Sequence, residues 1–362
     1  MRLKSLYRVK NFKVSLQDCE TWLTLFMDAP SLQEQSRLQE IRESLENVLL
    51  RGRGLNVLEA CLARNIRVIG DDIYLRLFHG SDQQYLIDSV RESLNSLSWP
   101  KRIVVDPRSI PGVKRTIAIG SGKGGVGKTS VTVALAKSLR NHGYSVGILD
   151  ADVYGPNIST VLGAEQLTVH TSEGPEGSQF LPPIVDEIQV MSVGFLASKD
   201  QSLAWRGPIL TRLLKQFMYD VRWENLDFLL IDLPPGTGDP QITVLQESPV
   251  VSVLLVGIPG ASSYSDLTRT IAMYRQFGLP IMGYVENFSS VTCPKCGTSF
   301  SFLLDQCDMY GQKSLNYEIN LLTQLPVTPD LLTNRDDSII TSLESIHPSA
   351  FQQLADNVSS LL

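Results

Sequence analysis

The chain has 362 residues, of which 43% are hydrophobic and 19% are charged, and its 32 lysines and arginines against 38 aspartates and glutamates give a formal net charge of -6. This composition excludes a disordered chain, and the length predicts about two domains that can each bury a core. The acidic surplus disfavours nucleic acid or an anionic membrane as a partner. Five cysteines in so long a chain, and the lack of a ~20-residue apolar run, predict a cytoplasmic protein with reduced thiols.

The N-terminal third of the sequence predicts a helical segment followed by a small α+β domain. Residues 1–50 form the helical segment, because capping-box spacings begin at Ser15 and Ser31 and apolar residues follow on one helix face. Residues 51–105 form the small domain, in which we expect antiparallel strands and a buried Cys61. Its expected elements are an apolar helix near 55–64, strands at 66–69, 73–78 and 102–105, and a helix at 82–97. Two prolines and a glycine within 106–113 predict a linker, taken as residues 106–115.

Residues 116–362 have the pattern of a larger α/β domain. Short β-branched runs alternate with helical periods, and these runs are apolar throughout, which is typical of parallel strands covered on both faces. We therefore predict an α/β fold with a mostly parallel, doubly wound sheet. The expected strands are 116–120, 145–150, 228–232, 250–256 and 281–287, and helices are expected from about 128, 208 and 348 and around 267–278.

A phosphate-binding loop stands between the first of these strands and the next helix. Residues 122–129 read GKGGVGKT, which matches G-x-x-x-x-G-K-[ST] in a strand–loop–helix context; the alternative is a glycine-rich connector without a ligand. Glycines let consecutive backbone N–H groups turn towards phosphate oxygens, and the helix N-terminus adds its positive dipole end. Lys128 would reach the β- and γ-phosphates of ATP, and Thr129 would bind Mg²⁺. The expected nucleotide-binding residues of the loop are Gly122, Lys123, Gly124, Gly125, Val126, Gly127, Lys128 and Thr129.

Lys123 directly follows the first glycine of this loop, where an ordinary phosphate loop requires no lysine. GKGGVGKT thus resembles the deviant Walker A loop of the ATPases that include nitrogenase iron protein, the Min and Par positioning ATPases, arsenite-pump ATPase and Mrp. The resemblance implies a P-loop NTPase that forms a homodimer around two nucleotides, in which Lys123 reaches the partner's nucleotide.

Carboxylates follow two of the predicted strands, at the sheet edge where open α/β folds bind ligands. ILDADVYGPN places Asp150 and Asp152 after one strand, and FLLIDLPPGTGD ends another strand at Asp232. Asp232 has the position of a Walker B aspartate that holds Mg²⁺, although each carboxylate has the alternative role of a loop or helix cap. By resemblance, Asp152 orients or activates the attacking water and Asp150 supports the Mg²⁺. The resemblance also implies that Asn287, in VENFS, hydrogen-bonds adenine.

Cys293 and Cys296 form a C-x-x-C pair, CPKCG, soon after the predicted strand 281–287. Tetrahedral zinc or a cubane iron–sulfur cluster takes four ligands, so one chain offers too few, even with Cys307 as a third. In a two-fold dimer the same pair from the second chain would complete the set. Three alternatives remain open here: a zinc ion shared by the dimer, a redox-active pair, and surface thiols without a function.

Several longer strings narrow the resemblance. From about Arg115 to the C-terminus the chain contains, in this order, DADVYGPNI, WRGPIL, LLIDLPPGTGDPQIT, VENFS and CPKCG. Together they resemble the Mrp family of iron–sulfur cluster carrier ATPases, and the α+β unit before them resembles a diverged form of that family's small N-terminal domain. The resemblance implies an ATP-hydrolysing carrier that shares a labile [4Fe–4S] cluster between two subunits and passes it to apo-proteins, with cluster scaffold proteins as further partners.

Two other functions of the same superfamily are alternatives. A Min- or Par-type positioning ATPase would bind no metal, and Min proteins reach membranes through a basic C-terminal helix, whereas no lysine or arginine follows Arg335 here. A reductase that resembles nitrogenase iron protein would use separated single cysteines rather than one C-x-x-C pair. We therefore expect an iron–sulfur carrier that binds neither nucleic acid nor membrane.

Overall fold

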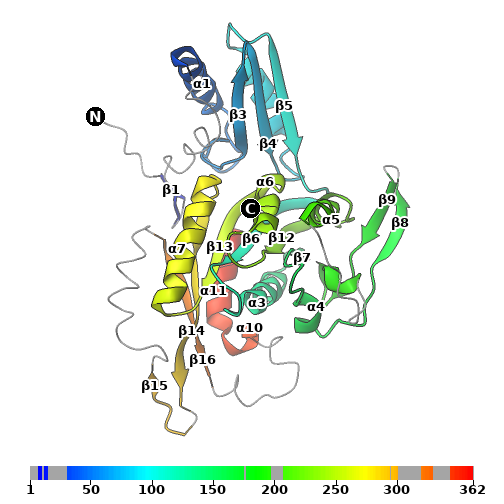
Figure 1. Cartoon of the computed structure of the whole chain (residues 1–362), viewed down its shortest axis with the longest axis vertical. Coiled ribbons are helices and arrows are strands. Elements are labelled where there is room, and N and C mark those ends of the chain that lie inside the picture. Colours follow the sequence, from blue (N-terminus) through cyan, green and yellow to red (C-terminus); the bar gives the residue numbers. More distant parts are fainter. Residues whose placement is uncertain are drawn as a thin grey trace. The chain divides into compact units, whose positions relative to one another are not determined.

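The computed structural model describes residues 7–9, 12–14, 31–174, 177–196, 207–293, 295–300, 319–328 and 343–361. The chain divides into a first unit, Met1–Ile110 with Tyr274–Pro280, and a second unit, Pro111–Met273 with Ile281–Leu362 (Figure 1). Among the described residues, no helix is both long and apolar enough to cross a membrane.

The described part of the first unit contains a three-stranded sheet and two helices. The helices are α1 (Leu32–Leu45) and α2 (Tyr85–Asn95), and the strands are β3 (Ala63–Ile69), β4 (Asp72–Phe78) and β5 (Arg102–Arg108), in the order β3-β4-β5, with a separate ribbon of β1 (Tyr7–Val9) and β2 (Phe12–Val14). The capping box predicted at Ser31 is confirmed, because the Glu34 N–H donates to Ser31 Oγ and the Ser31 N–H donates to Glu34 Oε2. Buried apolar side chains of α1, α2 and β4 form the core, among them Ile41, Leu45, Leu86, Val90, Ile73 and Leu77.

Two expectations for this unit are wrong. The helix expected near 55–64 is a series of turns, because the Asn56 side chain accepts hydrogen bonds from the N–H groups of Leu58 and Glu59, and Cys61 has a left-handed φ of 50°. Cys61 is nevertheless buried, as predicted. The strands are not all antiparallel: β3 and β4 are, but β4 and β5 are parallel because α2 crosses over between them.

The connection between the units also differs from the expected linker, 106–115. β5 continues through Arg108 and β6 (Val113–Ser121) begins soon after, so most of the expected linker is strand. Pro107 is tolerated because β5 is an edge strand, which pairs only with β4 in the part of the chain that the structure describes. Likewise α1, which the sequence assigned to a separate segment 1–50, packs on α2 and β3 of the same unit.

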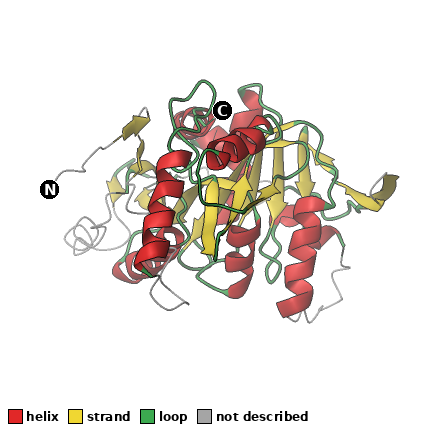
Figure 2. Cartoon of the chain, turned by 90° about the horizontal axis from the view of Figure 1, so that it is seen from above, coloured by secondary structure: helices red, strands yellow, loops and turns green. Residues whose placement is uncertain are grey.

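The second unit is built around a mostly parallel sheet, with nine strands among the described residues, and this sheet confirms the predicted fold class. The strands lie in the order β10-β11-β7-β12-β6-β13-β14-β15, with β16 paired to β14. Only the pairs β10–β11 and β14–β15 are antiparallel. Every residue of β7 and nearly every residue of β12 and β13 is buried, so both faces of the central strands are covered. Figure 2 shows the strands, in yellow, among the helices, in red.

Of the other elements of the second unit, those predicted from the sequence fall close to their expected positions. The remaining elements, among them the strands between residues 170 and 191 and the helix Asp239–Glu247, were not predicted. In chain order all of these elements are α3 (Lys128–Asn141), β7 (Val146–Asp150), α4 (Ile158–Val161), the hairpin of β8 (His170–Gly174) and β9 (Gly177–Leu181), β10 (Ile184–Val185), β11 (Ile188–Met191), the 3₁₀ turn η2 (Val193–Phe195), α5 (Gly207–Tyr219), β12 (Leu226–Asp232), α6 (Asp239–Glu247), β13 (Val250–Gly257), α7 (Ala261–Gln276), β14 (Ile281–Thr292), β15 (Ser299–Phe300), β16 (Leu321–Val327), α10 (Leu343–Ile346) and α11 (Pro348–Ser359). β14 runs past its expected end at 287 to Thr292, and the cysteine pair begins at the next residue.

Candidate functional site

The phosphate loop joins the end of β6 to the start of α3, as the sequence predicts. Gly125 and Gly127 have left-handed φ angles of 76° and 82°, which favour glycine. A Cβ atom on Gly127 would also lie 2.3 Å from Asn287 Nδ2, whereas one on Gly124 would find its nearest atom at 3.9 Å. The loop is thus tightly packed against Asn287 at Gly127 and uncrowded at Gly124, and backbone N–H groups at the α3 N-terminus can bind an anion.

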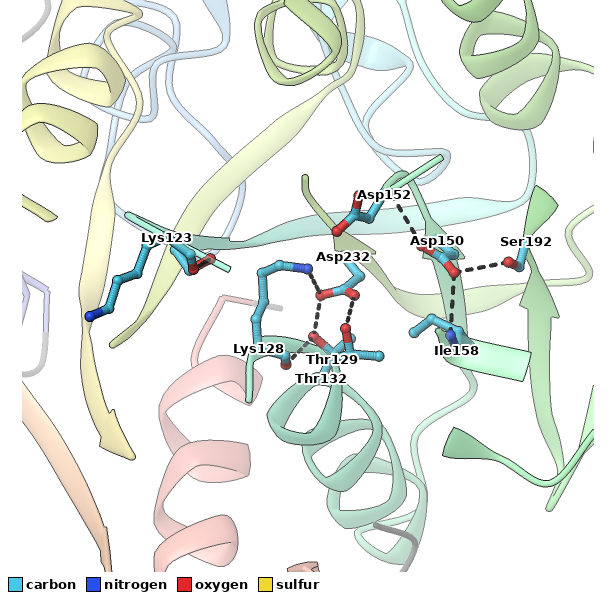
Figure 3. Close-up of polar contacts among 10 residues, drawn as sticks. Lys123, Lys128, Thr129, Thr132, Asp150, Asp152, Ile158, Ser192 and Asp232 are labelled. Atoms are coloured by element: carbon cyan, nitrogen blue, oxygen red, sulfur yellow. Dashed lines mark hydrogen bonds and ion pairs between the residues drawn. The ribbon is translucent and has the colours of Figure 1, made fainter. Parts of the chain in front are cut away.

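Asp232 ends β12 and contacts three side chains of the loop and of α3 (Figure 3). Its carboxylate lies 2.8 Å from Lys128 Nζ and accepts hydrogen bonds from Thr129 Oγ1 at 2.7 Å and from Thr132 Oγ1 at 3.0 Å. Sequence reasoning assigned Lys128, Thr129 and Asp232 to the nucleotide site and missed Thr132. The signal for it was available, because a residue four positions after Lys128 lies on the same face of α3.

The buried Lys128 ammonium fits a phosphate ligand. Apart from its ion pair with Asp232, it makes no hydrogen bond of good geometry to any described residue, and its side chain is only 6% exposed. An ammonium has three donors, so Lys128 retains donors for phosphate oxygens. Thr129 and Asp232 supply the oxygen ligands that Mg²⁺ prefers. The residues present at this site therefore fit a magnesium nucleotide.

Asp150 is buried at the end of β7, in register with Asp232 on the neighbouring strand. Its carboxylate accepts hydrogen bonds from Ser192 Oγ at 2.9 Å, the Asp152 N–H at 3.1 Å and the Ile158 N–H at 3.3 Å (Figure 3). Burial, and then the charge of Asp232, raises the pKa of Asp150 to about 7. Ser192 had no local signal in the sequence, because it reaches Asp150 only through the pairing of β11 with β7.

We expect Asp150 to make the ligand-free protein less stable as the pH rises. Its ordinary pKa is 3.8 and its folded pKa is about 7, so between these values the folded state holds a proton that the unfolded state has lost. As the pH rises between these two values, this group therefore lowers the free energy of unfolding by up to about 1.4 kcal/mol per pH unit. Asp150→Asn has no such proton, and its free energy of unfolding should fall less. Chemical denaturation of both proteins at about pH 5 and about pH 7 measures the difference, and equal slopes would contradict it.

Asp152 and Lys123 lie at the margin of this cluster. Asp152 is partly buried, and burial raises the pKa of its carboxyl group although the charge of Lys128 opposes the rise. In Figure 3, Asp152 lies near Asp232, whereas the ammonium of Lys123 points away from Lys128 and Asp232. One chain thus brings together most of the predicted residues, but it does not bring Lys123 to its own site.

Asn287 reaches the phosphate loop from β14. Its buried side-chain amide donates a hydrogen bond to the Val126 carbonyl at 2.9 Å. The preceding residue, Glu286, accepts hydrogen bonds from Tyr264 Oη at 2.7 Å and Gln324 Nε2 at 2.8 Å, which hold β14 against α7 and β16. Asn287 therefore supports the loop, and its contact with adenine stays a prediction.

Cys293 and Cys296 lie in the tight turn between β14 and β15. The Cys293 N–H donates to the Thr298 carbonyl at 3.0 Å, and the Gly297 N–H donates to the Cys293 carbonyl at 2.9 Å. Cys296 is exposed, and the hydrogen bond between its thiol and Thr298 Oγ1, 3.4 Å long, lowers the pKa of the thiol. Within the described part of the chain, no group of three or more Cys, His, Asp or Glu side chains is gathered as metal ligands. Cys307, the suggested third ligand, lies outside the described residues.

Comparison with known proteins gives matches over most of the chain. The family model described as NUBPL iron-transfer P-loop NTPase matches residues 112–359. An iron-sulfur cluster carrier protein of Escherichia coli K12 is 38% identical over 272 residues, covering 74% of this chain and 72% of that protein. A protein of the same name from Haemophilus influenzae is 32% identical over 361 residues, covering 94% and 95%. A solved nucleotide-binding protein from Archaeoglobus fulgidus, in complex with ADP, is 33% identical with a TM-score of 0.55, covering 67% of this chain and 93% of that one.

Proposed function

The chain belongs to the family of NUBPL iron-transfer P-loop NTPases, and from this membership we propose that it is an ATP-hydrolysing carrier that holds an iron–sulfur cluster between two subunits and transfers it to apo-proteins. One observation carries the proposal: β14 links the two sites. Asn287 of β14 is hydrogen-bonded to the phosphate loop, and the cysteine pair begins directly after the last residue of the same strand. A change at the nucleotide thus has a short covalent path to the thiols.

The residues around the phosphate loop can perform phosphoryl transfer, which requires mainly positioning and charge neutralisation. Backbone N–H groups of the loop and Lys128 bind the phosphates, while Thr129 and Asp232 hold Mg²⁺, which supplies positive charge beside the phosphates when bound. Asp152 orients the attacking water. Asp150, which accepts a hydrogen bond from Ser192 Oγ, supports the Mg²⁺ when it is bound.

A second copy of the chain completes both sites. The Lys123 ammonium points away from its own Asp232, so we assign it to the nucleotide of the partner in a homodimer. The hairpin of one chain offers two cysteine ligands and a four-ligand cluster needs two more, which the same hairpin of the partner supplies. The lysine and the cysteines therefore require the same two-fold assembly.

The cysteine turn is suited to binding a cluster that is later transferred to another protein. The lowered pKa of Cys296 favours the thiolate that binds iron, and its exposure gives an acceptor protein access to the cluster. We take the cargo to be a [4Fe–4S] cluster received from scaffold proteins, in a reducing compartment such as the cytoplasm. A zinc ion bridging the same four cysteines is the second candidate, because it has the same ligand count. A positioning ATPase is not favoured, because the matching family is one of iron-transfer NTPases.

We further propose that the first unit is the small N-terminal domain of such carriers in a diverged form, joined to the ATPase domain that follows it. The described part of this unit is of the α+β class that the resemblance implies. The alignment with the Haemophilus influenzae relative covers 94% of this chain, so it includes most of the first unit.

Anaerobic reconstitution with iron and sulfide tests the proposed function. We expect a dimer that contains iron and sulfide in equal amounts, at about four of each per dimer, and that converts an apo iron–sulfur protein to its active form. The same preparation is assayed for zinc, and its mass is measured by sedimentation with and without magnesium ATP. A protein that binds zinc but no sulfide would support the bridged-zinc alternative. A protein that stays monomeric with both nucleotide and metal would contradict the carrier assignment.

A further inference from the structure

Phe288, the residue after Asn287, has an unusual backbone and an exposed aromatic ring. Its φ is 52°, in the left-handed region that bulky residues rarely adopt, and 42% of the residue is exposed. The pairing of β14 with β16 is irregular at the same place, between Asn287 and Val291. Such a conformation persists only where the surrounding structure holds it, and residues of this kind cluster at functional sites.

The Phe288 ring lies at the border of the phosphate loop. A Cβ atom built on Gly127 would be 3.9 Å from Phe288 Cζ, so the tip of the ring is next to the residue that precedes α3. The hydrogen bond from Asn287 Nδ2 to the Val126 carbonyl fixes the neighbouring residue to the same loop. A partly exposed aromatic ring thus stands beside the phosphate loop, whose backbone N–H groups can bind an anion.

We propose that the ring of Phe288 forms a wall of the base-binding part of the nucleotide site and stacks on the base. The proposal rests on the nucleotide binding described above and names a residue that contacts the base. A planar aromatic base linked to a polyphosphate matches this pair of surfaces, because aromatic side chains stack on bases while N–H groups bind phosphates. The buried Asn287 amide already donates to Val126, whereas Phe288 offers exposed apolar surface at the same place.

Calorimetric titration with two ligands separates base binding from phosphate binding. Magnesium ADP carries a base, and magnesium tripolyphosphate does not. For Phe288→Ala we expect the affinity for ADP to fall about tenfold or more, as is typical when a stacking side chain is removed, and the affinity for tripolyphosphate to stay within about twofold. Phe288→Tyr keeps the stacking surface and should retain ADP binding.

Two further variants make the result specific. Phe300→Ala removes an aromatic side chain of similar exposure from β15 and should change neither affinity. Phe288→Gly removes the ring but suits a φ of 52°, so it should fold and still lose ADP affinity. Equal weakening of both ligands in the Phe288 variants, or unchanged ADP binding, would overturn the proposal. Failure of the unaltered protein to bind either ligand would instead overturn the nucleotide function itself.

Discussion

Replacing Cys293 and Cys296 together by alanine is expected to abolish iron and sulfide binding. It should also abolish the absorbance of the reconstituted protein at about 400 nm, which thiolate-ligated iron produces. Both thiols come from one exposed turn between β14 and β15, and in a two-fold dimer the double substitution removes all four cluster ligands at once. ADP affinity should be unchanged, because the phosphate loop lies at the far end of the Asn287–Thr292 segment.

Cys61→Ala is the matched control for this experiment. Cys61 is buried in the first unit, so its thiol is not accessible to a cluster. Its replacement should leave the iron and sulfide content as in the unaltered protein. Both proteins are reconstituted anaerobically side by side, and their iron, sulfide and zinc contents are measured. Full cluster retention in the double variant would show that other residues bind the metal.

Replacing Lys123 by alanine is expected to lower the ATP hydrolysis rate by about 10³-fold, the lower end of the effect of a cation that is supplied in trans. The ammonium of Lys123 points away from Lys128 and Asp232 of its own chain, so nucleotide binding by one chain should persist. Steady-state hydrolysis and ADP titration measure the two effects separately.

Mixing two inactive variants tests whether Lys123 acts in trans. In a mixed dimer of K123A with D152N, the K123A subunit has an intact Asp152 and receives Lys123 from its partner, so one of the two sites is complete. Random pairing makes half of the dimers mixed, and the mixture should regain about a quarter of the unaltered rate. If Lys123 acted in its own chain, every site would carry a defect and the mixture would remain inactive.

The chemistry of this chain could be predicted where it depends on short stretches of sequence. The phosphate loop was found because strand, glycine pattern and helix follow one another directly, and Asp150 and Asp232 because each ends an apolar run. The parallel sheet followed from runs that are apolar on both faces. The turn at Asn56 was missed because a side chain there competes with the helical hydrogen bonds that the apolar pattern suggests.

The order of residues in the chain thus determines which chemical groups the site contains and which strand ends carry them. Their partners are not determined in this way, because those come from packing between distant segments: Ser192 and Asp150 are 42 positions apart, and Thr132 and Asp232 are 100 apart. The outward direction of Lys123 and the left-handed φ of Phe288 depend likewise on the loop and strand geometry that the folded sheet imposes. Local periodicity reports which face of an element is buried, whereas contacts across the sheet depend on strand order and register, which no short stretch of sequence encodes.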